Sequence, residues 1–164
     1  MRIAIGSDHR GFPTKERLKH YLVAQGHKVA DMGSKTDSSC DYPDYAIPVC
    51  LQVANKKAAR GILLCGSGIG MTMTANKIHG IRAALCHDEL TAQMSRHHNN
   101  ANVLCLPADL LGDELIKRMV DVWLAAAFDA GRHSRRVSKV MGAEKVNPAK
   151  FHDQTGEYVS KEKD

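Results

Sequence analysis

One stretch in the middle of the sequence constrains the fold more than any other. The apolar run of residues 61–64 ends at Cys65, and three alternate glycines (Gly66, Gly68 and Gly70) lead into a helix-compatible segment. This order predicts a buried parallel strand, a tight turn and the start of a helix. Glycines leave backbone N–H groups free to face outward, and with the positive helix end they can hold a phosphate or a developing oxyanion. We therefore expect an anion site with Cys65 at its rim, where a thiolate is favoured.

Spacing excludes two familiar nucleotide-binding motifs at this turn. The dinucleotide fingerprint needs a glycine where this sequence has Met71, and the phosphate-binding loop of nucleotide hydrolases needs Gly-Lys-Ser/Thr, a run that the sequence lacks. For the turn taken alone, a tight connection without any chemistry remains the simplest alternative.

Segments with strand and helix patterns alternate along the rest of the chain. We expect strands at residues 2–7, 27–31, 61–65, 81–86 and 101–106, and helices at about 13–25, 43–53, 70–77, 88–97, 112–128 and 134–144. This alternation predicts an α/β fold, a Rossmann-like three-layer αβα sandwich with a five-stranded parallel sheet. Residues 1–148 are expected to form a single domain, and residues 149–164 a polar tail with little periodicity.

The composition excludes several classes of function. The net charge of +5 is mild, and the basic residues form no dense stripe, so nucleic-acid binding is not expected. No apolar run approaches the length of a membrane span, and no leader pattern is present, so we expect a cytoplasmic protein without a membrane partner. The five cysteines include no C-x-x-C pair, which argues against a disulfide framework or a zinc site.

Several candidate side chains are expected at the carboxyl edge of the sheet, where parallel sheets bind ligands. Asp8 and His9 follow the first strand, and His98 ends the helix before the fifth. Arg132 and Arg136 have the i, i+4 spacing that places two guanidinium groups on one helical face, as a clamp for a phosphate dianion. Each has a simpler reading as well: a helix N-cap for Asp8, a dipole complement for His98, and a solvated face for the arginines.

These motifs together resemble the ribose-5-phosphate isomerase type B family, which includes galactose-6-phosphate and allose-6-phosphate isomerases. The matching segments, in order, are Gly6-Ser7-Asp8-His9-Arg10-Gly11, Asp41-Tyr42-Pro43, Cys65-Gly66-Ser67-Gly68-Ile69-Gly70, Ala75-Asn76-Lys77, Ser95-Arg96-His97-His98-Asn99 and Gly131-Arg132-His133. The resemblance covers residues 2 to about 144. It implies an aldose–ketose isomerisation that needs no metal and no cofactor. It also implies a small phosphorylated sugar as substrate and a homodimer, or a tetramer, with active sites shared between subunits.

The resemblance also implies a role for each matching residue. Cys65 would be the base that moves a proton between C1 and C2, and His98, with Asp8 nearby, would open the furanose ring. The enediolate would be held by Ser67 and by the backbone of Gly66, Gly68, Ile69 and Gly70. The phosphate would be bound by His9, Arg132 and Arg136, with the arginines and the last helix reaching the partner subunit, and substrate hydroxyls would be contacted by Tyr42 and Asn99.

Two positions deserve comparison with the family pattern. Some relatives replace the cysteine and use a glutamate at the position of Met71, so Cys65 is the expected base in this sequence. Some members carry an arginine near the position of Asp109 that helps to bind the phosphate, and an acid there would repel a phosphate if it pointed inward. Sugar length is therefore the open part of the assignment.

The leading hypothesis is an isomerase of ribose 5-phosphate and ribulose 5-phosphate. The same chemistry on a hexose 6-phosphate, of the allose or galactose type, is the nearest alternative. A phosphosugar-binding protein without turnover is a third, although binding alone needs neither the Cys65 base nor the His98 acid.

Overall fold

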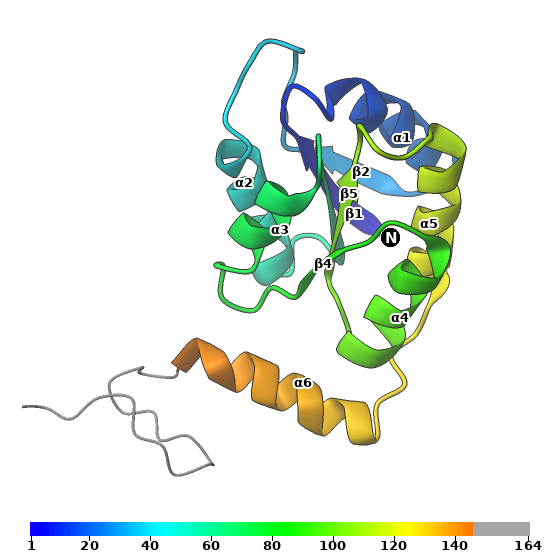
Figure 1. Ribbon diagram of the computed structural model, residues 1–164. Coiled ribbons are helices and arrows are strands. Elements are labelled where there is room, and N and C mark those ends of the chain that lie inside the picture. The colour runs from blue at the N-terminus through cyan, green and yellow to red at the C-terminus, as the bar shows by residue number, and fades with distance from the viewer. Residues whose placement is uncertain (146–164) are drawn as a thin grey trace, which may run out of the picture.

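The computed structural model describes residues 1–145, and its centre is a five-stranded, all-parallel sheet (Figure 1). The strands are β1 (Arg2–Ser7), β2 (Lys28–Asp31), β3 (Arg60–Cys65), β4 (Ala83–Leu85) and β5 (Val103–Pro107), in the order β2-β1-β3-β5-β4. In the central pairs, Ile5 lies opposite Ile62 and Ile62 opposite Leu104. Both β3 and β5 are almost continuously apolar, because a parallel sheet that is covered on both faces buries every side chain.

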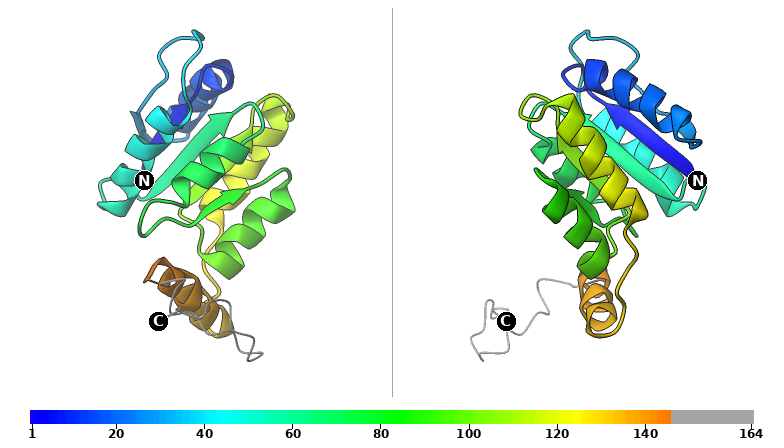
Figure 2. Two further views of the ribbon diagram at one scale, coloured as in Figure 1. Left: turned by 60° about the vertical axis from the view of Figure 1, so that its left-hand side comes forward. Right: turned by 90° about the vertical axis from the view of Figure 1, so that its right-hand side faces the viewer.

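Helices cover the two faces of the sheet, so the predicted three-layer sandwich is confirmed (Figure 2). One face carries α1 (Phe12–Ala24), α4 (Glu89–Asn99) and α5 (Asp113–Ala125), and the other carries α2 (Pro43–Ala54) and α3 (Ile69–Ala75). The first core contains Ile62, Leu104 and Trp123. The second contains Leu63 and Cys105. Successive residues of a strand therefore serve opposite cores, as the alternation of side chains requires.

Local signals in the sequence explain several element ends. Pro13 lies in the first turn of α1, and the side chain of Asp88 caps α4 by accepting a hydrogen bond from the Thr91 N–H at 2.7 Å. Two elements are shorter than expected by three residues or more: β4 covers only residues 83–85, and α5 ends at Ala125 because Ala126 is already extended.

The last helix, α6 (Arg132–Gly142), lies apart from the sandwich and approaches it near the end of α4 (Figure 1). It begins two residues earlier than expected and is followed by the short 3-10 turn η1 (Ala143–Lys145). Its only buried residue is His133, and Val140 remains 58% exposed. The predicted tail, residues 149–164, lies outside the described residues. Within residues 1–145, no helix combines the length and the hydrophobicity that crossing a membrane requires.

Candidate active site

The glycine turn between β3 and α3 has the conformation that the sequence predicts. Gly68 has φ +74°, in the left-handed region, and a Cβ placed on it would collide with the Leu85 side chain. Its backbone N–H donates to the Cys65 Sγ atom at 3.1 Å. Since α3 has only seven residues, the anion-binding capacity of this turn rests mainly on its own backbone N–H groups.

Cys65 is the last residue of β3 and is only 4% exposed. Burial raises the pKa of its thiol, and the nearby charge of Asp8 raises it further. Backbone N–H groups of Met71, Gly68 and Ser67 lower the pKa, but they do not outweigh burial. The expectation that the thiolate is favoured at this position is therefore wrong for the chain as it stands. The turn supplies donors for a thiolate, but burial of the side chain favours the protonated thiol.

Asp8 and His9 lie in the loop that follows β1. Asp8 is 5% exposed, and its Oδ1 atom accepts a hydrogen bond from the Gly11 N–H at 2.9 Å. Its own N–H donates to the Leu64 carbonyl at 3.2 Å, which ties the loop to β3 one residue before Cys65. The Asp8 carboxylate thus accepts a hydrogen bond within its own turn and also raises the pKa of the Cys65 thiol. The capping role and an influence on the candidate base therefore coexist in one residue.

Three further predicted residues lie around the same edge of the sheet. His9 is half-buried, and its Nδ1 atom lies 3.3 Å from both the N and the O atoms of Cys40. Tyr42 places its ring so close to Gly70 that a Cβ there would meet the ring at 2.6 Å. Ser67 is exposed at the tip of the turn. This edge therefore offers an open approach from solvent to a buried thiol.

The other predicted residues lie at the opposite edge of the sheet, which corrects the expectation that all of them share one edge. A helix that follows a parallel strand runs back along the sheet, so α4 ends near the amino ends of the strands (Figures 1 and 2). His98 and Asn99 stand at that end of α4, just before β5 begins. Arg132 and Arg136 lie on α6, which approaches the same end.

The His98 ring stacks on the His133 ring, with centroids 4.4 Å apart and an angle of 2° between the planes. With Asp129, these histidines form a group whose possible ligand atoms all lie within 4.8 Å of one another. Ring nitrogens bind metals in the plane of the ring, and two parallel rings direct their lone pairs side by side rather than toward one point. The stack is thus not a preformed chelate, and it fixes the orientation of His98 instead.

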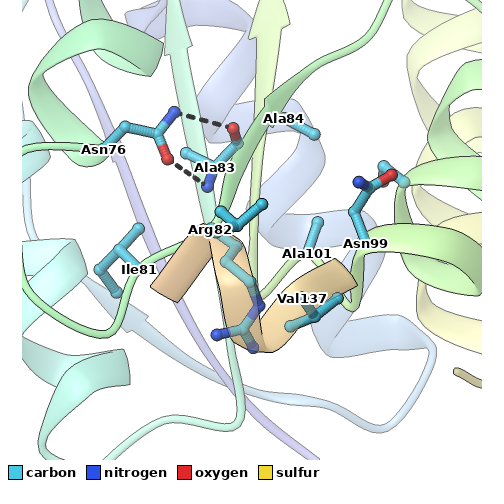
Figure 3. A pocket seen from close by; sticks show the side chains of 10 residues that line it. Asn76, Ile81, Arg82, Ala83, Ala84, Asn99, Ala101 and Val137 are labelled. Atoms are coloured by element: carbon cyan, nitrogen blue, oxygen red, sulfur yellow. Dashed lines mark hydrogen bonds between the residues drawn. The ribbon is translucent and has the colours of Figure 1, made fainter. Parts of the chain in front are cut away.

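Asn99, at the same end, lines a small cavity of about 200 Å³ that separates α6 from the sheet (Figure 3). Across the cavity, the Asn76 amide donates to the Ala83 carbonyl and accepts from the Ala83 N–H, each at 2.9 Å. Val137 closes the cavity from α6. Asn99 therefore faces the underside of α6 and lies far along the sheet from Cys65.

Sequence analysis missed one pair beside the turn. The Arg10 Nε atom donates to Asp109 Oδ2 at 2.6 Å, and a Cβ on Gly66 would meet both of these atoms within 3 Å. The Asp109 N–H donates to the Gly66 carbonyl at 3.1 Å. Arg10 directly follows His9 in the sequence, and this position next to a candidate phosphate ligand was the one signal that could have indicated it.

Comparisons with known proteins place the chain in a family. A family model described as Ribose/Galactose Isomerase matches residues 3–140. Ribose-5-phosphate isomerase B of Escherichia coli is 43% identical over 143 residues, which are 87% of this chain and 96% of that protein. Among solved structures, a ribose 5-phosphate isomerase of Thermotoga maritima is 48% identical with a TM-score of 0.85, covering 86% of this chain and 97% of that one.

A further solved structure carries a ligand. Ribose-5-phosphate isomerase B of Mycoplasma genitalium, with bound ribulose-5-phosphate, is 41% identical with a TM-score of 0.85, and the match covers 89% of this chain and 97% of that one. The family model spans most of the chain, and the relatives exceed 40% identity along nearly their whole length. The chain therefore belongs to the ribose/galactose isomerase family.

Proposed function

We propose that this protein interconverts ribose 5-phosphate and ribulose 5-phosphate. The observation that carries the proposal is a cysteine Sγ that lies on a glycine turn, within hydrogen-bond distance of the Gly68 N–H and under the influence of a buried carboxylate, Asp8. The names of its relatives and the ligand of the Mycoplasma genitalium structure support this choice of substrate.

The isomerisation needs a base and an acceptor for negative charge. The Cys65 thiolate takes the proton from C2 of the open-chain aldose, and the electrons move through C1 onto the carbonyl oxygen to give an enediolate. The proton of the C2 hydroxyl passes to O1, and the same thiol returns the proton that it took from C2 to C1, which leaves a carbonyl at C2 and yields the ketose. A positioned base contributes about 10²–10⁴ in rate, and one well-aimed donor to the oxyanion about 3–4 kcal/mol.

The resting thiol has to lose its proton before this step. Asp8 is the buried carboxylate whose charge acts on the thiol, and a proton that leaves Cys65 can be released to solvent through the open edge. The backbone N–H of Gly68 then stabilises the thiolate, because it already points at the Sγ atom.

We infer that a second copy of the chain completes the site. His98, Asn99, Arg132 and Arg136 lie at the edge of the sheet opposite Cys65, so one chain cannot bring them to its own thiol. In a two-fold dimer each copy can offer these groups to the other, and α6, with its weak contact to its own body, suits packing on the partner. In this proposal α6, in the single domain expected for residues 1–148, serves the neighbouring subunit.

Asp109 does not oppose a phosphate in this arrangement, because the guanidinium of Arg10 neutralises it at 2.6 Å. The Nε atom makes that contact, and the two Nη atoms have no hydrogen-bond partner among residues 1–145. Arg10 thus offers a fork of donors beside Gly66, where a sugar phosphate can be bound in a bidentate manner. We therefore keep the pentose phosphate as the leading substrate and hexose 6-phosphates as the alternative.

The first test is turnover of ribose 5-phosphate and allose 6-phosphate in the presence of a chelator, alongside Cys65→Ala. We expect chelator-resistant conversion of the pentose, with turnover abolished and ligand affinity retained in the variant. Preference for the hexose would shift the substrate assignment. Tight binding without turnover on either sugar would favour a binding protein.

The shared site is tested by mixing two inactive variants, Cys65→Ala and His98→Ala. If each site draws Cys65 and His98 from different subunits, re-equilibrated dimers include mixed ones with one intact site, and about a quarter of the activity returns. If one chain supplied both residues, the mixture would stay inactive.

A further inference from the structure

A second concave site lies at the amino edge of the sheet, opposite the thiol. It is a cavity of about 580 Å³ between the starts of β1 and β3 and the segments that lead into β4 and β5. Its cationic lining residues are Arg2, Lys56, Lys57, Arg60 and Arg82, and no Asp or Glu lines it. We refer to it below as the basic cavity. Its volume falls within the range of about 300–1,000 Å³ that is usual for small-molecule sites.

The charges of the basic cavity are not neutralised. None of its five cations forms an ion pair within residues 1–145, whereas Arg10, Lys15, Arg17, Lys19, Lys117 and Arg118 all do. The carboxylate of Glu144 in η1 acts electrostatically on Arg82, but its contacts are the His79 ring and the Gly80 N–H, which donates to it at 3.1 Å. The chain therefore concentrates positive charge here without supplying its own counter-charge.

Two of these guanidinium groups are half-buried, and a third lies behind them. Burial lowers the pKa of Arg60 and of Arg82, and the charge of Arg82 lowers that of Arg60 further. Arg96 is 4% exposed, and burial together with the charges of Arg60 and Arg82 lowers its pKa to about 10. Three like charges thus share a poorly solvated region, an arrangement that an anion would relieve.

Backbone carbonyls hold the guanidinium groups in place. Arg82 donates from Nε to the Asn100 carbonyl at 2.9 Å, and Arg60 donates from Nη1 to the Ala59 carbonyl at 2.9 Å. Arg96 donates from Nη1 to the Ala101 carbonyl at 2.6 Å. The buried Nε atoms of Arg60 and Arg96 have no partner among residues 1–145. Donors that are fixed in position and not fully used characterise a site that is organised before its ligand arrives.

From this geometry we propose that the basic cavity binds a compound with a diphosphate group, either free or as part of a nucleoside diphosphate. Guanidinium groups match phosphate oxygens in a bidentate manner, and two phosphates supply enough negative charge to compensate several cations at once. Asn100 and Asn102 also line the cavity and add polar groups for a non-charged part of the ligand.

This site is separate from the glycine turn that carries Cys65 in the same chain. Arg60 begins β3 and Cys65 ends it, and five residue steps of extended chain separate them by about 16 Å. A molecule bound at the basic cavity therefore does not occupy the glycine turn of the same chain. The proposal also does not depend on turnover of any sugar, because its readout is binding.

The test is calorimetric titration of the full-length protein with inorganic pyrophosphate, and separately with ADP, in the presence of saturating ribose 5-phosphate. We expect binding that weakens about tenfold or more in Lys56→Gln/Lys57→Gln, whose exposed lysines can be changed without disturbing the core. Lys117→Gln/Arg118→Gln is the matched control, because it removes the same two charges from α5. Arg60→Gln, checked for folding, should weaken binding further.

The outcomes separate the possibilities. Equal affinity for pyrophosphate and ADP would assign the site to the diphosphate group alone, and tighter binding of ADP would assign it to a nucleotide. The proposal is overturned if neither probe binds, if ribose 5-phosphate competes both probes away, or if the control variant loses as much affinity as Lys56→Gln/Lys57→Gln. The KM for ribose 5-phosphate should stay unchanged in both lysine variants, which keeps this test independent of the catalytic assignment.

Discussion

Arg10 and Asp109, 99 residues apart in the sequence, meet at 2.6 Å against Gly66, the residue that follows the candidate base. The pair joins the loop after β1 to the loop after β5 and leaves a guanidinium fork beside the turn. Arg10 is 59% exposed, so this ion pair contributes little to stability, and its effect is expected on the ligand instead.

Replacing Arg10 therefore tests substrate binding. Arg10→Gln should raise the KM for ribose 5-phosphate about tenfold with little change in kcat, because it removes a charge-assisted contact to the substrate. Asp109→Asn leaves the guanidinium in place but untethered, so a smaller rise is expected. Steady-state kinetics would decide, with Arg17→Gln and Asp113→Asn as controls, since these residues form a similar pair on α1 and α5. An unchanged KM in Arg10→Gln would remove Arg10 from the site.

Gly68 offers a test of the turn itself. Gly68→Ala combines a φ of +74° with a collision against Leu85, so it should destabilise the fold and abolish turnover. Gly26 has φ +80° and open space around its Cβ direction, so Gly26→Ala should cost only the backbone term of about 1–2 kcal/mol. Chemical denaturation gives the free energy of unfolding of both variants, and the difference between them is the cost of the collision with Leu85. Equal losses would mean that Leu85 moves aside.

Buried thiols should make the fold sensitive to alkali. Burial raises the pKa of Cys50 to about 12 and that of Cys86 to about 11, whereas the unfolded chain releases these protons near pH 8.5. The unfolded state thus loses protons first as pH rises, and stability falls between pH 8.5 and these higher values. At pH 10 the loss should be about 2 kcal/mol for Cys50. Urea unfolding at pH 7.5 and 10 would measure it, and Cys50→Ala should show a smaller difference between the two pH values.

Burial also raises the pKa of Cys65, the candidate base, so catalysis should depend on pH. Since its thiol pKa is raised and the thiolate is the reactive form, kcat/KM should keep increasing with pH beyond the point at which an ordinary thiol ionises. The absorbance of the thiolate, compared between the wild-type protein and Cys65→Ser, would show whether ionisation follows the same curve. A profile that is flat from pH 6 to 10 would contradict Cys65 as the base.

Lys15 is fully buried and is expected to matter for stability. Its ammonium lies 2.8 Å from Asp31 Oδ1 and 2.8 Å from the Ser34 carbonyl. Lys15→Met removes the buried ammonium from both acceptors and should cost about 3–5 kcal/mol. Lys19 reaches the same carboxylate at 3.0 Å from a more exposed position, so Lys19→Met should cost less than about 1 kcal/mol. Similar losses of stability in Lys15→Met and Lys19→Met would show that the burial of Lys15 does not make its contacts more important.

Much of the fold follows from short-range signals. The apolar runs that end at Ser7, Cys65 and Pro107 predict buried parallel strands, and the Asp88 cap marks the start of α4. The order of the strands cannot be read in this way, because it depends on which apolar faces pack together in three dimensions. Nor can the pairing of Arg10 with Asp109, since nothing local to either residue indicates the other.

The placement of His98 shows a different kind of miss. Its position at the end of a helix was correct, but a helix that leaves the carboxyl edge of a sheet ends at the amino edge. The direction of the strand therefore already separated His98 from Cys65 in the same chain. Read with that rule, the sequence itself predicts His98 and Cys65 at opposite edges of the sheet of one chain.

The separation of α6 from the sandwich also bears on how the protein folds and assembles. Both cores draw their residues from positions up to Trp123, so the last residue needed to close them precedes α6 in the chain. The body can therefore complete its cores without α6, and the helix that carries Arg132 and Arg136 stays available for another surface. If these arginines serve the partner, each chain folds by itself and gains activity only on pairing, which makes chain concentration in the cell a control on catalysis.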